Sequence, residues 1–147
     1  MSKFATGVTV VLAENNKNVH GMTANAFMSV SLNPKLILVS ISKKAKMQQY
    51  LKKTNQFSIN ILSNKQQDIS KTFAGQNNSN IEINNFLYRQ NVPIISDSVA
   101  TLVCTTYKTV DAGDHVLYIG EVIDIMVRND QPLIYLEGSY MQTMQHT

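Results

Sequence analysis

GMTANAFMSVSLNPKLILVSI, the stretch from Gly21 to Ile41, decides the fold of this chain. It holds two short apolar runs typical of β-strands, separated by the turn-forming dipeptide Asn33-Pro34. The small side chains before Phe27 leave peptide N–H and C=O groups unshielded. A flat heteroaromatic ring with donors and acceptors could therefore be bound here by the main chain alone. On composition alone, a half-buried strand that ends in a Ser-rich bend is the simpler interpretation.

Length and composition limit the classes of protein to which this chain can belong. A chain of 147 residues is long enough for one domain with its own core, and we expect a single domain over residues 1–147. No run approaches the roughly 20 apolar residues of a membrane span, and we expect a cytoplasmic protein without a membrane anchor or a metal site. The single cysteine, Cys104, lies in the apolar run TLVCTTY, which favours a buried, inert thiol.

Most of the chain reads as short strands with tight turns. The expected strands are Gly7–Ala13, Val19–Asn25, Phe27–Ser31, Leu36–Ser42, Phe57–Ser63, Ala100–Tyr107, His115–Val127 and Leu133–Leu136. Two helices are expected, Lys43–Thr54 and Lys65–Ala74, the second capped by Asn64. The Asn-rich stretch Gly75–Asn91 is expected to form a surface loop.

The order of these elements predicts a mostly β fold with two short helices, built as an antiparallel barrel. Strands do not alternate with regular crossover helices, and the sequence contains neither G-x-G-x-x-G nor a P-loop. Any nucleotide cofactor would therefore be held without the standard phosphate-binding loops.

Five collinear segments carry a family resemblance. In chain order they are FATGVTVVLA, GMTANAFMSVSLNPKLILVSI, FSINILSNKQQDISKTFAG, GDHVLYIGEV and PLIYLEGSY. Together they resemble the short-chain flavin reductases, which are the NAD(P)H:flavin oxidoreductase components of two-component monooxygenases. The resemblance implies the FMN-binding split barrel, an antiparallel β-barrel of Greek-key type. It also implies hydride transfer from the nicotinamide to the flavin.

The resemblance assigns cofactor contacts along the central stretch. The residues implied to hold FMN are Thr23, Ala24, Asn25, Ala26, Ser29, Ser40, Ser42, Lys43, Lys46 and Met47. Ala26 replaces the usual Ser of this motif, and Ala45 and Met47 stand where phosphate-binding hydroxyls are expected. Each lost charge-assisted hydrogen bond is worth about 1.5–3 kcal/mol. Lys43 and Lys46 at the start of the first expected helix could offset part of that loss.

The nicotinamide side is implied by two further segments. The G-D-H motif, Gly113-Asp114-His115, places His115 beside the flavin as the catalytic residue, with Tyr140 on the same side. Tyr135 and Tyr140 are candidates for packing beside the cofactor cleft. Considered alone, a histidine at the start of a strand is more often a structural hydrogen-bonding group, and the tyrosines are equally compatible with the core or a dimer interface.

Cofactors and partners follow from the same resemblance. FMN is implied as the flavin, with FAD as an alternative, and NADH or NADPH as co-substrate. A homodimer and a separate oxygenase component are implied as partners. A non-catalytic FMN-binding protein of the same fold remains an alternative. A basic nucleic-acid-binding barrel is a more distant one, because the net charge is only +3 and the lysines are not interleaved with aromatic residues.

Overall fold

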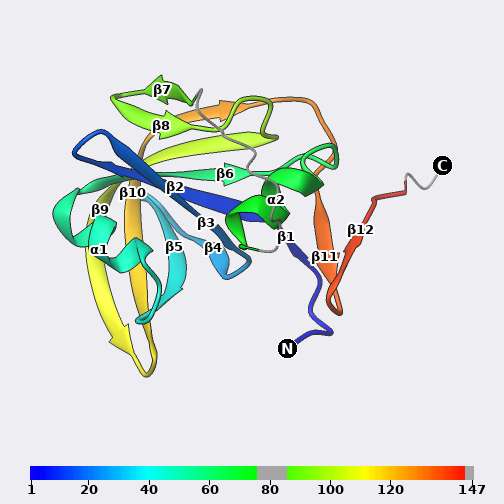
Figure 1. The fold of residues 1–147 in the computed structure, drawn as a ribbon, viewed down its shortest axis with the longest axis horizontal. Coiled ribbons are helices and arrows are strands. Elements are labelled where there is room, and N and C mark those ends of the chain that lie inside the picture. The colour runs from blue at the N-terminus through cyan, green and yellow to red at the C-terminus, as the bar shows by residue number, and fades with distance from the viewer. Residues whose placement is uncertain (76–85, 145–147) are drawn as a thin grey trace.

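The structure, a computed structural model, describes residues 1–75 and 86–144. It is built mainly of antiparallel strands, as Figure 1 shows, and the mostly β class expected from the sequence is confirmed. The strands are β1 (Thr6–Gly7), β2 (Thr9–Asn15), β3 (Asn18–Ala24), β4 (Phe27–Leu32), β5 (Lys35–Ser42), β6 (Gln56–Ile61), β7 (Leu87–Arg89), β8 (Val92–Ile94), β9 (Ala100–Ala112), β10 (His115–Val127), β11 (Ile134–Leu136) and β12 (Ser139–Met141).

The main sheet has two edge strands that are neighbours in sequence. Within the described residues, its seven strands follow the order β3-β2-β6-β9-β10-β5-β4. The edges, β3 and β4, are joined only by Asn25 and Ala26, so the chain crosses from one edge of the sheet to the other in a single corner. In the part of the chain that the structure describes, the two edge strands do not pair with each other, so the sheet does not close into a complete barrel.

Both helices are shorter than the sequence predicts. The first helix, α1 (Met47–Lys53), begins four residues later than expected, because residues 43–46 form a turn instead. The second, α2 (Gln67–Phe73), begins after Gln66 rather than at Lys65. Asn64 is therefore not its N-cap, and the Gln66 side chain instead accepts a hydrogen bond from the Ser63 N–H at 2.9 Å.

Two short hairpins were not predicted: β7, β8 and β12 are absent from the expected strands, whereas β11 corresponds to the expected strand Leu133–Leu136. Strands β7 and β8 pair around Gln90 and Asn91, and β11 and β12 pair around Glu137 and Gly138. All four of these turn residues have positive φ angles, as type I′ hairpin turns require. The rest of the expected Asn-rich loop, residues 76–85, lies outside the described residues.

The core explains why these elements stay together. Alternating apolar residues of β2, β5, β6 and β9 meet inside the barrel, where Val11, Val39, Phe57 and Ile59 are fully buried. Helix α1 closes this cluster at one end with Met47. A second cluster under α2 joins β2 to the β11–β12 hairpin. The ends of the molecule are thus different: the long β9–β10 hairpin extends at one end, and β1, β11 and β12 lie at the other (Figure 1).

Candidate active site

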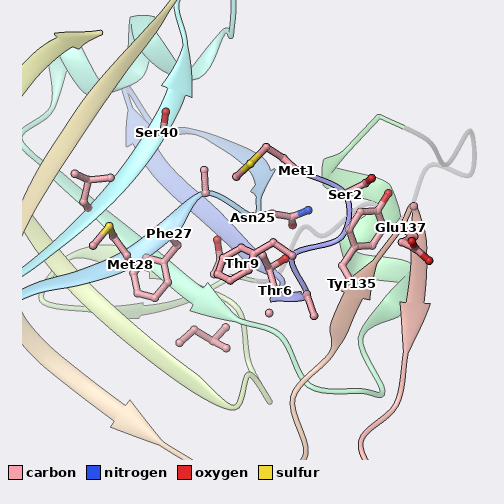
Figure 2. A pocket seen from close by; sticks show the side chains of 17 residues that line it. Met1, Ser2, Thr6, Thr9, Asn25, Phe27, Met28, Ser40, Tyr135 and Glu137 are labelled. Carbon is pink, nitrogen blue, oxygen red and sulfur yellow. The ribbon is translucent and has the colours of Figure 1, made fainter.

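A cavity of about 840 Å³ opens beside the corner between β3 and β4. Its volume falls in the range typical of cofactor sites. Figure 2 shows Phe27 and Met28 on one side of it and Tyr135 and Glu137 on the other, with Asn25 between them. The residues around it are Met1, Ser2, Phe4, Ala5, Thr6, Gly7, Thr9, Asn25, Ala26, Phe27, Met28, Leu38, Ser40, Ile61, Tyr135, Glu137 and Gly138.

The main chain at the corner lies in the wall of this cavity. The Ala26 carbonyl accepts a hydrogen bond from the Ser40 N–H, and the Asn25 carbonyl accepts one from the Phe27 N–H, both at 3.0 Å. Among the hydrogen bonds within residues 1–75 and 86–144, the N–H groups of Asn25 and Ala26 are not donors. An unpaired N–H is costly unless water or a ligand satisfies it. The corner is therefore suited to an acceptor-bearing ring.

Seven of the ten predicted flavin contacts do not line the cavity, and three of them lie on strands β3 and β4. Thr23 uses its hydroxyl within the protein, donating to the Ser70 carbonyl at 2.7 Å. Ala24 is buried, and its carbonyl accepts a hydrogen bond from the Thr9 hydroxyl at 2.6 Å. Ser29 pairs with the buried Ile37, so its side chain lies on the opposite face of β4 from Met28. Of the four-residue motif, only Asn25 and Ala26 reach the cavity.

Strand register places His115 on the same sheet face as the cavity. His115 pairs with Ser42, and Met28 pairs with Leu38 across β4 and β5. Directly paired residues share a face, and so do residues two apart along a strand. Leu38, Ser40 and Ser42 therefore lie on one face of β5, together with Met28 and His115. Ser42, the partner of His115, is two residues and so about 7 Å along β5 from the cavity-lining Ser40. The sheet therefore aligns three predicted site residues, Ser40, Ser42 and His115, on one face, although only Ser40 lines the cavity.

An exposed carboxylate holds the His115 ring. Asp114 Oδ1 lies 2.7 Å from His115 Nδ1, and this hydrogen bond, followed by the attraction of the charged ring, lowers the pKa of Asp114. An ionised carboxylate can only accept, so Nδ1 carries the proton and Nε2 is left for a ligand. Gly113 turns the hairpin with a φ of 65°, which favours glycine. The three residues of the motif therefore form one unit that presents an imidazole.

The predicted phosphate segment is only partly supported. Met47 is fully buried in the core, so its side chain is a core residue and the prediction that it contacts flavin is corrected. Lys43 follows Ser42 and lies on the other face, where its Nζ pairs with Asp111 Oδ1 at 2.9 Å. Lys46 is exposed and close enough to His20 to contribute, after burial, to that residue's lowered pKa. Since α1 begins at Met47, these lysines precede the helix in a turn.

Lys43 instead borders a second, more polar cavity. This space of about 620 Å³ lies between α1 and the inner face of β9 and β10, and Tyr118 lies on its wall. Tyr118 and His115 are three residues apart on β10, and so lie on opposite faces of the strand. The residues around this second cavity are Lys43, Gln48, Leu51, Lys52, Asn55, Thr106, Thr109, Asp111, Val116 and Tyr118.

Tyr140 does not lie near the G-D-H hairpin of its own chain. It belongs to β12, at the opposite end of the molecule from the β9–β10 turn (Figure 1). Its hydroxyl lies 2.7 Å from Ser70 Oγ, and its ring meets the edge of Tyr135 at a centroid distance of 5.4 Å. Tyr135, rather than Tyr140, lines the cavity. The two groups predicted for the nicotinamide side are therefore not brought together within one chain.

Sequence reasoning missed several residues of the cavity. Thr9 and Ile61 come from β2 and β6, and Leu38 from β5. Their segments were recognised as strands, but a strand pattern does not show which residues border the split. Only the observed register, in which Thr9 pairs with both Ala24 and Ile61, places them beside the corner.

Comparison with known proteins identifies the family. Residues 1–144 match the flavin reductase like domain. An NADH-dependent flavin reductase of Rhodococcus sp is 40% identical over 143 residues, which cover 95% of this chain and 81% of that protein. The reductase component of a 4-hydroxyphenylacetate 3-monooxygenase from Thermus thermophilus is 31% identical, with 95% of this chain and 90% of that protein covered.

A solved structure agrees with these relatives. The flavin reductase PheA2 has a TM-score of 0.96 and 49% identity to this chain, over 99% of this chain and 94% of that one. The chain belongs to the flavin reductase family. No helix in the described part is long and apolar enough to cross a membrane. No group of three or more His, Cys, Asp or Glu side chains among the described residues is placed to hold a metal ion.

Proposed function

We propose that residues 1–147 act as one cytoplasmic domain that reduces FMN with NADH and delivers the reduced flavin to a separate oxygenase. The protein is an oxidoreductase of the flavin reductase type, like the Rhodococcus relative. The observation that supports the placement of the flavin is that Asn25 and Ala26 line the larger cavity, and that their N–H groups donate no hydrogen bond to residues 1–75 or 86–144. A bound flavin supplies N5 as the acceptor for the hydride from nicotinamide C4.

The corner would bind and polarise the ring. The N–H groups of Asn25 and Ala26 would donate to ring acceptors, where negative charge grows on reduction, and fixed donors of this kind act as an oxyanion site does. Phe27 and Met28 would contact the ring through apolar surface, and Ser40 would add a hydroxyl. The protein's share of the barrier reduction is then positioning plus local electrostatics.

His115 would act at the nicotinamide side. Its ring lies on the cavity face, and Asp114 fixes the tautomer with the proton on Nδ1. Nε2 is then free to hydrogen-bond the nicotinamide. Replacing His115 with alanine should raise the KM for NADH and lower kcat. Unchanged values for both would remove this role.

A homodimer would cover the exposed apolar surface of β4 and β10. Leu32 is 89% exposed and Val127 is 72% exposed, with Val30, Ile123 and Ile125 also exposed on these two strands. Single exposed apolar residues are ordinary, but a group of large ones on two strands of one sheet marks an interaction surface. Leu32→Lys together with Ile125→Lys should therefore give a monomer in analytical ultracentrifugation. A dimer that persists in this variant would place the interface elsewhere.

The phosphate segment favours loose flavin binding. Ala45 and Met47 stand where the family pattern has phosphate-binding hydroxyls. Lys43 forms a salt bridge with Asp111. A flavin that leaves after reduction suits a protein that feeds a separate oxygenase. The same observation supports the second candidate function, a non-catalytic FMN-binding protein of this fold, which would bind FMN without oxidising NADH.

The decisive experiment measures NADH oxidation and flavin binding together. Purified protein should oxidise NADH only when FMN is added, and FMN fluorescence quenching should give a dissociation constant. Ala26→Leu would fill the cavity and should raise the FMN Kd by about tenfold or more, since overpacking costs about 1–3 kcal/mol. Ala74→Leu, on the exposed C-terminal end of α2, is the matched control. Binding without NADH turnover would favour the non-catalytic candidate. An unchanged Kd in Ala26→Leu would move the flavin away from this cavity.

A further inference from the structure

One buried serine joins β3 and β12, two strands that are adjacent in the chain or sheet to opposite walls of the larger cavity. Ser70 lies in α2 and is only 1% exposed. Its carbonyl accepts a hydrogen bond from the Thr23 hydroxyl at 2.7 Å, and its own hydroxyl lies 2.7 Å from the Tyr140 hydroxyl. Thr23, Ser70 and Tyr140 come from β3, α2 and β12, which lie next to one another in Figure 1.

Each end of this chain of contacts leads to the cavity wall. Thr23 lies two residues before Asn25, so its bond to Ser70 fixes the end of β3 where the corner begins. Tyr140 pairs with Tyr135 across the β11–β12 hairpin, and their rings meet at 65°. Tyr135 is the residue of this pair that lines the cavity. Figure 2 shows it on the far side of Asn25 from Phe27 and Met28.

Further contacts hold the Tyr140 ring in one orientation. Lys71 Nζ lies 5.9 Å from the ring centroid, within the range of a cation–π interaction. Tyr140 also packs against the second core cluster, which includes Leu12 and Leu133. The Ser70 bond is therefore the polar connection of a ring that is otherwise held by apolar and π contacts.

We propose that Ser70 and Tyr140 are positioning residues for flavin binding, which set the distance between the Asn25–Ala26 corner and the Tyr135 wall. This inference rests on the proposed placement of the flavin in the larger cavity. It assigns Tyr140 an indirect role in holding the flavin through Tyr135, in place of a direct contact with nicotinamide. It also gives α2, whose residues are absent from the cavity lining, a role in flavin affinity.

The physical reason is that ring contacts depend steeply on distance. A gap of 0.5–1 Å between apolar surfaces forfeits about a quarter to a half of their attraction. The Ser70–Tyr140 hydrogen bond holds the β11–β12 hairpin against α2, while the Thr23 bond holds α2 against β3. Loss of either hydroxyl of the Ser70–Tyr140 pair would let the Tyr135 wall move relative to the corner. Flavin affinity would fall, but the chemistry of flavin once bound would not change.

The test is a double-mutant cycle with Tyr140→Phe and Ser70→Ala. Each removes one hydroxyl of the same hydrogen bond, and the Thr23 bond to the Ser70 carbonyl remains in both. Each single variant should raise the FMN Kd by about fivefold, and the double variant should raise it no further, because one bond is lost in all three. At saturating FMN, kcat and the KM for NADH should stay at their wild-type values. Thr72→Ala is the control, since its hydroxyl donates to the Asp68 carbonyl within the same helix.

Three outcomes would overturn the inference. An unchanged FMN Kd with a lower melting temperature would make Ser70 and Tyr140 purely structural. A higher KM for NADH with an unchanged FMN Kd in Tyr140→Phe would place Tyr140 directly at the nicotinamide. Independent, additive effects of the two variants would mean that they do not act through their shared bond. Ala26→Leu separates this inference from the placement of the flavin: if it weakens FMN binding and Tyr140→Phe does not, only the positioning role fails.

Discussion

Helices α1 and α2 have the same length, seven residues each, but are attached to the barrel in opposite ways. Helix α1 buries Met47 and Leu51 in the main core. In α2 the fully enclosed residue is the polar Ser70, which is bonded on one side to β3 and on the other to β12. One helix closes the barrel with apolar side chains, and the other joins two elements through hydrogen bonds.

Strand β3 contacts both helices, which makes the difference informative. His20 stacks on Tyr50 of α1 at a centroid distance of 5.0 Å, and Thr23 is bonded to Ser70 of α2. Apolar burial contributes most of the free energy of folding but has no direction, whereas a hydrogen bond has a defined geometry. We therefore expect changes in α1 to act mainly on stability and changes at Ser70 to act mainly on flavin affinity.

The largest effect is expected from Met47→Ala. The side chain is fully buried, and removing it leaves a cavity in the main core. The free energy of unfolding should fall by about 2–5 kcal/mol, measured by urea denaturation, while the FMN Kd at low temperature should stay near its wild-type value. A large rise in Kd with little loss of stability would restore Met47 as a flavin contact and remove the contrast between the helices.

Gly21→Ala should come next and tests the apolar side of α2. A Cβ at this position would lie 2.3 Å from the Phe73 ring and 2.8 Å from Leu12 Cδ2, so the ring must move outward. We expect the free energy of unfolding to fall by about 1–3 kcal/mol. Gly7→Ala is the control for stability, because a Cβ there meets nothing within 4 Å. Equal melting temperatures for both variants would show that Phe73 adapts freely and that α2 is not tightly packed on β3.

Gln48→Ala removes the buried polar contact of α1. The Gln48 amide donates to the carbonyls of Ile41 and Ser42, each at 3.1 Å, and its oxygen accepts a hydrogen bond from the Tyr118 hydroxyl. A buried group left without its partner costs about 1–3 kcal/mol, and we expect a loss in the lower part of that range by thermal unfolding. Gln49→Ala, at an exposed position, should change little. If both variants behave alike, α1 is held by its apolar residues alone.

The smallest effect is a pH dependence at the α1–β3 contact. Burial, and then the charge of Lys46, lower the pKa of His20 from 6.5. The folded state therefore binds fewer protons than the unfolded state, so stability rises with pH between the folded-state pKa and 6.5 and is lost as pH falls through that window. His20→Gln should flatten this part of the melting-temperature profile relative to wild type. A variant profile parallel to that of the wild type would contradict the role of His20.

The main sheet was largely predictable because its signals are local. Apolar and β-branched runs such as those around Val10, Ile37 and Ile59 occur where strands β2, β5 and β6 lie. Turns were harder. Gln90 and Glu137 adopt positive φ angles without being Gly or Asn, so the β7–β8 and β11–β12 hairpins carry no strong turn signal.

The site was predicted correctly only at residues where the family motif and the observed path of the main chain agree. Asn25 and Ala26 reach the cavity, and the register places Ser40, Ser42 and His115 on one sheet face. The prediction failed at Met47, because a residue aligned with a phosphate-binding hydroxyl can turn into the core when it is apolar. Tyr135 was predicted beside the cleft from its local segment, whereas the role proposed for Ser70 depends on its contact with Tyr140, 70 residues away, which no local pattern encodes.

Cys104 has a practical consequence for studying motion in this protein. It is the sole cysteine and fully buried, and burial raises the pKa of its thiol to about 12. The thiolate is the form that alkylating dyes attack, so the native protein should remain unlabelled near neutral pH. A cysteine introduced at the exposed Ser139 would then be the single reactive site. A fluorophore placed there would report the β11–β12 hairpin directly, in a chain that keeps its natural core.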